Sequence, residues 1–188
     1  MIYPEKLEGQ FIKLRSVLEN DAEFILKLRL DCALNKYLNK VDNDLEKQIL
    51  WIKEQQKREN DFYFIIERKS GLPIGTISLY NIKESEGEFG RWVSIGNAVE
   101  NVESVLLLHD FGFYKMNLDL IYSETVKENE KVLNFHKRFG ANLLNEFREY
   151  NKFIVQKAII KKENYEIIRE NNQKIINYYC KKLDIYNN

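Results

Sequence analysis

The stretch that decides the fold runs Asn129-Glu-Lys-Val-Leu-Asn-Phe-His-Lys-Arg-Phe-Gly-Ala141. Its apolar residues fall at helical spacing, and it ends at Gly140, the residue type that a left-handed helix C-cap prefers. Directly before it, residues 118–126 read Leu-Asp-Leu-Ile-Tyr-Ser-Glu-Thr-Val and are typical of a strand. Taken alone, this pattern also fits an ordinary surface helix with a good C-cap, so the rest of the chain has to decide.

The remaining sequence alternates between strand and helix periodicity. Strands are predicted where β-branched and aromatic residues cluster, over 9–17, 62–67, 73–82, 88–95, 141–147 and 151–160. Helices are predicted after the capping pair Asn20 and Asp21, and over 44–58 and 99–115. Short turns join the three strands between 62 and 95, which favours an antiparallel meander. The predicted order is β-α-α-β-β-β-α-β-α-β-β.

This order and the quoted helix together resemble the GNAT superfamily of N-acetyltransferases, over about residues 7–160. The family pattern is Asn-x-x-Ala-x-x-Leu-Tyr-x-x-x-Gly-Phe, and Asn129 and Gly140 stand at its ends. Glu88-Phe-Gly-Arg-Trp92 resembles the Glu-x-Gly-x-Trp strand of one branch. That branch includes ribosomal-protein N-terminal acetyltransferases and acetyltransferases of nucleotide-linked amino sugars. The resemblance implies an α/β (α+β) fold, with a mixed, mostly antiparallel twisted sheet of about seven strands flanked by helices.

The whole chain, residues 1–188, is expected to form one domain with an additional C-terminal helix over 162–183. No Gly-, Pro- or Ser-rich linker separates that helix from the body. It could pack on the body, which we expect, or against another subunit, which leaves a homodimer open. Its predicted apolar stripe consists of Tyr165, Ile168, Ile175, Tyr179 and Leu183.

Composition narrows the function classes. Lys+Arg and Asp+Glu number 29 each, so no overall positive charge indicates a nucleic-acid-binding protein. Cys32 and Cys180 are far apart and have no metal-ligand spacing, which fits a reducing compartment better than a disulfide framework. No apolar run has the length of a membrane span, and no signal-peptide core begins the sequence. We therefore expect a cytoplasmic protein without a metal.

The resemblance implies that acetyl-CoA is the co-substrate. In the family the pantetheine arm lies in a wedge between two splayed strands, bound by free backbone groups that here belong to Trp92, Val93 and Ser94. The diphosphate then lies at the N-terminus of the next helix, which places Gly96, Asn97 and Ala98 in that role. The family's asparagine, which helps to hold the coenzyme arm, corresponds to Asn129. A helix cap alone would also explain Asn129.

The diphosphate loop departs from the family pattern. The signature Gln/Arg-x-x-Gly-x-Gly/Ala is missing, and Gly96 is the only glycine between residues 94 and 104. No Lys or Arg lies between Arg91 and Lys115, and Glu100 and Glu103 are expected to repel phosphate. Backbone amides alone can still bind a diphosphate.

Two residues are predicted to be catalytic. Glu88 occupies a position where this branch often has an acidic residue facing the acceptor, and it would take the proton of the attacking amine; alternatively it is a solvated strand-end glutamate. Strand alternation predicts that Gly90 and Trp92 share its face. His136 stands at the family's tyrosine position and would protonate the departing thiolate; alternatively it faces solvent beside Lys137 and Arg138.

Three functions remain open. The acceptor would be a small-molecule amine, a nucleotide-linked amino sugar in the interpretation that we favour, or the α-amine of a protein N-terminus. A GNAT-fold domain that has lost catalysis and serves as a binding module is the third alternative, because the signature glycines are missing.

Overall fold

The computed structural model describes residues 1–187, and side chains as far as residue 182. The strands are β1 (Leu7–Glu8), β2 (Ile12–Ser16), β3 (Phe62–Arg68), β4 (Pro73–Lys83), β5 (Glu86–Ser94), β6 (Leu120–Val126), β7 (Asn142–Tyr150) and β8 (Phe153–Lys161). The helices are α1 (Ala22–Leu30), α2 (Leu45–Lys57), α3 (Ala98–Asp110), α4 (Glu130–Phe139) and α5 (Lys162–Asn187). A short 3-10 helix precedes α1, and a π-helical turn, Phe111–Lys115, continues α3.

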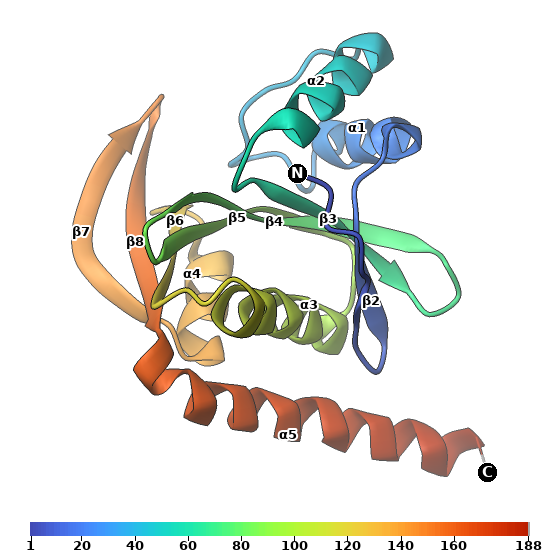
Figure 1. Ribbon diagram of the computed structural model, residues 1–188, viewed down its shortest axis with the longest axis vertical. Coiled ribbons are helices and arrows are strands. Elements are labelled where there is room, and N and C mark those ends of the chain that lie inside the picture. The colour runs from blue at the N-terminus through green and yellow to red at the C-terminus, as the bar shows by residue number, and fades with distance from the viewer. Residues whose placement is uncertain (188) are drawn as a thin grey trace.

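One sheet in the order β1-β2-β3-β4-β5-β6-β8-β7 organises these elements. Figure 1 shows α1 and α2 on one face of the sheet, with α3, α4 and α5 on the other. A larger apolar core packs against α3 and includes Phe64, Phe111 and Phe113, all buried. A smaller core under α1 and α2 includes Ile25 and Ile52. The fold class and the predicted order of elements are confirmed, and the sheet gains an eighth strand from the two-residue β1.

The sheet divides between β5 and β6. All other neighbouring strands pair antiparallel, whereas β5 and β6 pair in parallel over only three residues of each strand, Glu86–Glu88 with 120–122. Beyond Glu88, β5 remains paired with β4, and β6 remains paired with β8 as far as Val126. The facing edges of the two strands therefore diverge and leave their backbone groups without strand partners.

Strand β5 contains a bulge that corrects one prediction. Thr76 pairs with Val93 while Ser78 pairs with Gly90, so β5 has one residue more than β4 in this interval. Arg91 within it has a positive φ of 46°. The bulge shifts the alternation of side chains, so that Trp92 packs on the α4 side, against Phe135. The prediction that Trp92 shares the face of Glu88 is therefore wrong.

Helix α5 packs on the body of the molecule, as expected. The Tyr165 hydroxyl donates to the Leu106 carbonyl and to Asp110, and Asn172 donates to the Phe139 carbonyl. The buried stripe differs from the predicted one, because Ile176 is fully buried while Ile175 and Tyr179 are exposed. The side chain of Leu183 lies outside the described residues. Among residues 1–187 no helix is long and apolar enough to cross a membrane.

Gly140 forms the left-handed C-cap of α4, and its substitution tests that cap. It has a φ of 118°, and an added Cβ would lie 2.8 Å from Ile168 Cγ1 on α5. We expect Gly140→Ala to lower the free energy of unfolding by about 2 kcal/mol or more, because left-handed backbone strain and a steric clash add together. Denaturant unfolding monitored by circular dichroism measures this change.

Gly71→Ala is the matched control, because Gly71 also has a positive φ, 91°, but its Cβ would contact nothing within 4 Å. Its cost reports backbone strain alone. Equal costs for the two variants would contradict the packing of α5 against the end of α4.

Candidate active site

A cavity of about 420 Å³ opens where β5 and β6 diverge. Residues 89–94 of β5 line one wall, residues 123–126 of β6 line the other, and Asn129 and His136 reach it from the start and interior of α4. The edge backbone of β5 faces this cavity without a strand partner beyond Glu88. A linear, amide-containing ligand can satisfy such groups as an added strand would.

Trp92, Val93 and Ser94, the three strand residues predicted to bind the pantetheine arm, have different surroundings in the wedge. The Trp92 ring packs at 4.6 Å from Phe135, which anchors α4 against β5, and its indole nitrogen is buried without a hydrogen-bond partner among the described residues. Val93 is buried, and the Ser94 hydroxyl accepts the Gly96 amide at 2.9 Å. The wedge therefore exposes to its cavity the unpaired backbone of β5 and a turn at Gly96 that is held by the Ser94 hydroxyl.

The N-terminus of α3 is capped by its own side chains. The Asn97 side chain accepts the Glu100 amide at 3.0 Å, and Glu100 accepts the Asn97 amide at 2.8 Å, which together form a capping box. The amides of Ala98 and Val99, as the first two helical residues, have no intrahelical acceptor. Two amides at this end are therefore free to bind an anion, aided by the helix dipole.

The expected repulsion by two glutamates is wrong. The Glu100 carboxylate is paired with the Arg68 guanidinium, with 2.6 Å between Nε and the carboxylate oxygen. Burial raises the pKa of Glu100, but the hydrogen bond from Arg68 lowers it more, so that this pKa lies below its ordinary value. The Glu103 carboxylate instead accepts the amides of residues 10–12 and lies beneath β2. Arg68, which is distant in the sequence, supplies the neutralising charge that is absent from residues 92–114.

Asn129 begins α4 without using its side chain as a cap. Its carbonyl accepts from Val132 and Leu133, but the side chain makes no capping hydrogen bond. It lines the wedge and is half-buried. The side chain is therefore available for a ligand, as the family resemblance requires.

His136 is buried rather than facing solvent. It is 5% exposed, contacts the edge of Phe89, and its Nε2 lies 3.4 Å from the Ser123 hydroxyl. Burial lowers the pKa of His136 to about 4, so the imidazole is neutral at physiological pH. A neutral ring can donate a hydrogen bond to sulfur in the wedge, but it is not the strong acid that an imidazolium would be.

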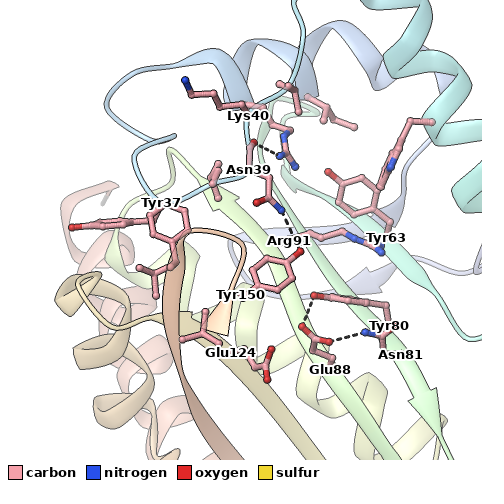
Figure 2. Close-up of a pocket in the computed structure, with 18 of the residues that line it drawn as sticks. Tyr37, Asn39, Lys40, Tyr63, Tyr80, Asn81, Glu88, Arg91, Glu124 and Tyr150 are labelled. Carbon is pink, nitrogen blue, oxygen red and sulfur yellow. Dashed lines mark hydrogen bonds between the residues drawn. The ribbon is translucent and has the colours of Figure 1, made fainter. Parts of the chain in front are cut away.

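A second cavity, of about 600 Å³, lies on the other face of β5 (Figure 2). Its floor comes from β3, β4 and β5, one side from the end of α1 and the loop that follows it, and the other from β6 and the β7–β8 hairpin. Tyr37 and Leu38 from that loop line both cavities. The two chambers therefore meet at β5 and under one loop.

Glu88 lies in this second cavity and is held by two donors. The Tyr80 hydroxyl donates at 2.5 Å to one carboxylate oxygen and the Asn81 amide donates at 2.7 Å to the other (Figure 2). Burial, followed by the Glu88 charge, raises the pKa of Tyr80, so that Tyr80 remains a donor. Glu88 is thus a positioned carboxylate within the cavity and not a solvated strand end.

Arg91, Asp61 and Tyr80 form a largely buried group on the floor of the second cavity, and the sequence did not predict that they lie together. The Arg91 guanidinium donates to both oxygens of Asp61, at 2.5 and 2.9 Å, and lies 4.2 Å from the Tyr80 ring centroid. Although burial lowers it, the hydrogen bonds to Asp61 raise the pKa of Arg91. The bulge in β5 directs Arg91 into this group, and the residue spacing within a single strand does not predict a bulge.

Among the side chains that the structure describes, those of residues 1–182, no group of three or more His, Cys, Asp or Glu is placed to hold a metal ion. The groups that can perform chemistry are therefore the backbone wedge, Asn129 and His136 on one side of β5, and Glu88 with its donors on the other.

A family model described as an acetyltransferase (GNAT) domain matches residues 12–142. The chain belongs to the GNAT acetyltransferases. It is accordingly an N-acetyltransferase, and this family uses acetyl-CoA. None of the curated proteins compared with it matches.

Solved GNAT structures share the fold over most of the chain. The FdhC apo structure, described as a nucleotide-linked sugar GNAT, has a TM-score of 0.79 and 32% identity and covers 93% of this chain and 98% of its own. A GCN5-related N-acetyltransferase from Brucella melitensis has a TM-score of 0.80, 15% identity and coverages of 92% and 85%. A spermidine N-acetyltransferase from Vibrio cholerae has a TM-score of 0.69, 17% identity and coverages of 84% and 97%.

Asn129→Ala separates a coenzyme contact from a helix cap in this GNAT acetyltransferase. Because the side chain makes no cap bond, the variant should lose less than about 0.5 kcal/mol of stability, against about 0.5–2 kcal/mol for a true cap. The KM for acetyl-CoA should rise severalfold with kcat little changed. Steady-state kinetics and thermal unfolding on one preparation decide; lost stability with an unchanged KM would make Asn129 a cap only.

The two histidines of the GNAT acetyltransferase give a second test. Burial lowers the pKa of both His109 and His136 to about 4, from an ordinary value of 6.5. Between about pH 6.5 and 4 the unfolded chain therefore binds protons that the folded chain does not. Their contribution to stability is complete above pH 6.5 and is lost as the pH falls towards 4.

Proton NMR should show both imidazole signals unchanged between pH 8 and pH 5.5, with His136→Phe identifying which signal is which. The melting temperature should fall progressively below pH 6.5. A signal that titrates near pH 6.5 and disappears in His136→Phe would place His136 in solvent.

Proposed function

We propose that this acetyltransferase transfers the acetyl group of acetyl-CoA to the amino group of a nucleotide-linked amino sugar, by direct attack of the amine on the thioester. The observation that carries the proposal is the charge of the second cavity. Four cationic side chains line it, against the two carboxylates Glu88 and Glu124, and Asp61 neutralises one of the four, Arg91, so one positive charge remains in excess. A cavity with this balance favours an acceptor that has one amine and an anionic portion. The likeness to FdhC over nearly the whole chain supports the same class.

The wedge is the site for acetyl-CoA, which supplies the activated acetyl group. The unpaired backbone of Trp92, Val93 and Ser94 would bind the pantetheine arm, with Asn129 beside it. The free amides of Ala98 and Val99 would bind the diphosphate, within the turn formed by Gly96 and Asn97. Lys131, which also lines the wedge, adds the positive charge that the loop lacks.

Glu88 takes the amine proton. Its two oxygens are fixed by Tyr80 and Asn81, so the carboxylate stays oriented into the acceptor cavity while the amine approaches. The proton passes to the carboxylate directly or through one water, and the neutral nitrogen then attacks the thioester carbonyl. The C–N bond forms, the C–S bond breaks, and the second proton lost by the nitrogen goes to the departing sulfur. An ordinary amine is largely protonated at neutral pH, so this step is needed before attack.

His136 stabilises the departing sulfur by donating a hydrogen bond from its neutral ring. The thiol of coenzyme A has an ordinary thiol pKa near 8.5, so its thiolate forms readily and gains from a donor. The Ser123 hydroxyl, 3.4 Å from Nε2, orients the imidazole. This revises the role expected from the sequence, because a ring with a pKa of about 4 carries no proton to give as a cation at pH 7.

The alternatives predict different acceptors. A polyamine such as spermidine is polycationic, and an excess of cationic side chains would repel it. A protein N-terminus would need a groove for an extended peptide, whereas the α1–α2 loop and the β7–β8 hairpin are hydrogen-bonded to each other at one side of this cavity. A non-catalytic module would bind acetyl-CoA without turnover.

The test is a coenzyme A release assay with a panel of acceptors: nucleotide-linked amino sugars, spermidine and short peptides with free N-termini. We expect kcat/KM to be highest for a nucleotide-linked amino sugar. Glu88→Gln should lower kcat about 10²-fold or more, because the amide keeps the shape but cannot take a proton. Turnover with spermidine or peptides alone would overturn the proposed acceptor.

His136→Phe in the same assay should lower kcat about 10-fold or more, the effect of removing one hydrogen bond to a charged group. His136→Tyr, which restores a donor, should recover part of the loss. Binding of acetyl-CoA without turnover on any acceptor would favour the non-catalytic module.

A further inference from the structure

One partly buried cation in the acceptor cavity has no counter-ion among the residues that the structure describes. Arg29, in the last turn of α1, lines the cavity and is only partly exposed. Its Nη2 donates to the Asn39 carbonyl at 2.8 Å, and its Nε is buried without a hydrogen-bond partner in the part of the chain that the structure describes. A buried guanidinium without a carboxylate is unfavourable unless something else neutralises it.

The neighbouring guanidiniums show the contrast. Arg91, on the floor of the same cavity, has Asp61, and Arg148, on the β7–β8 hairpin, has Glu124. Burial lowers the pKa of Arg29, the nearby Arg91 lowers it further, and Tyr63 opposes the change. Arg29 is therefore the guanidinium of this cavity that has no carboxylate partner among the described residues.

Lys40 adds a second cation near the same place. It lines the cavity and follows Asn39, the residue whose carbonyl accepts from Arg29. In Figure 2, Lys40 and Asn39 lie at one end of the cavity, and Glu88 and Asn81 lie at the other, with Tyr150 between them. The cavity thus has a cationic end and a carboxylate end, separated along its length.

We infer that Arg29, assisted by Lys40, binds the diphosphate of the acceptor, while the acceptor's amine lies at the opposite end beside Glu88. This inference rests on the proposed function and assigns the acceptor subsites within it. A guanidinium presents five N–H donors in a planar fork that matches phosphate oxygens, and only one of the five is used by Asn39. The anion would supply the missing counter-ion and fix which way the acceptor lies.

A purely structural role for Arg29 explains fewer of these observations. The bond from Nη2 to the Asn39 carbonyl holds the loop after α1, and a cation suits the C-terminal end of a helix. Neither effect requires the Nε to be buried beside a cavity, nor a second cation next to it. A structural role also predicts no dependence on the charge of the acceptor.

The experiment measures anion binding apart from turnover. Protein saturated with coenzyme A, so that the wedge is filled, is titrated with thymidine diphosphate, uridine diphosphate and inorganic pyrophosphate by calorimetry. We expect at least one nucleoside diphosphate to bind, and Arg29→Gln to raise its Kd tenfold or more. Lys27→Gln is the matched control, because Lys27 lies on the same helix but is exposed and paired with Glu23; it should leave the Kd unchanged.

Kinetics provide the second measurement. With a nucleotide-linked amino sugar, Arg29→Gln should raise KM tenfold or more with kcat changed much less, and Arg29→Lys should recover part of the loss. With an amino sugar that lacks phosphate, wild type and Arg29→Gln should have equal kcat/KM. Circular dichroism and thermal unfolding establish whether each variant is folded. If Arg29→Gln does not fold, the same measurements are made on Arg29→Lys.

The outcomes separate this inference from the proposed function. Equal Kd values for wild type and Arg29→Gln, or equal losses on acceptors with and without phosphate, would overturn the role of Arg29. Turnover of phosphate-free amino sugars without any nucleotide binding would overturn it too and leave the transferase intact. Nucleotide binding that depends on Arg29, with no transfer to any nucleotide-linked amino sugar, would support the anion subsite and refute the proposed acceptor.

Discussion

Both cavities depend on how little of β5 pairs with β6. The parallel ladder holds for three residues and then stops, and the bulge that follows gives Arg91 its left-handed backbone. The unpaired edge opens the wedge, while the shifted alternation sends Trp92 to one face of the sheet and Arg91 to the other. Longer pairing with β6 would close the wedge, and regular pairing with β4 would remove Arg91 from the second cavity, so two neighbouring irregularities of β5 shape the two chambers.

Buried charge is managed mainly by partners that are far apart in the sequence. Glu103 accepts three amides of residues 10–12, Glu100 pairs with Arg68, and Arg91 pairs with Asp61. Each of these contacts offsets part of the desolvation penalty of a charge near the sheet and connects elements that are distant in the sequence. Against this pattern the lone guanidinium of Arg29 stands out, because the rest of the fold neutralises its buried charges internally.

The sequence predicted the order of elements well, because periodicity and capping are local. Asp44 caps α2, Gly140 ends α4, and each strand from Phe62 to Ser94 lies close to its expected place. It did not predict the bulge, the placement of Trp92 or the counter-ion of Glu100, because these depend on contacts between distant segments. The burial of His136 could not be predicted either. The adjacent Lys137 and Arg138 indicate a turn of helix that faces solvent, but the packing of α4 on the sheet places His136 against Phe89.

The loop between α1 and α2 forms part of the wall of both cavities. Tyr37 donates to the Glu128 carbonyl, directly before Asn129. Asn39 is bonded to Tyr150 and Asn151 at the tip of the β7–β8 hairpin. These contacts are few and exposed, while the sheet beneath is buried, so the loop is the least strongly held part of the wall that the chambers share. Because it contributes Tyr37 and Leu38 to both cavities, a change of its position that admits one ligand alters the surface presented to the other.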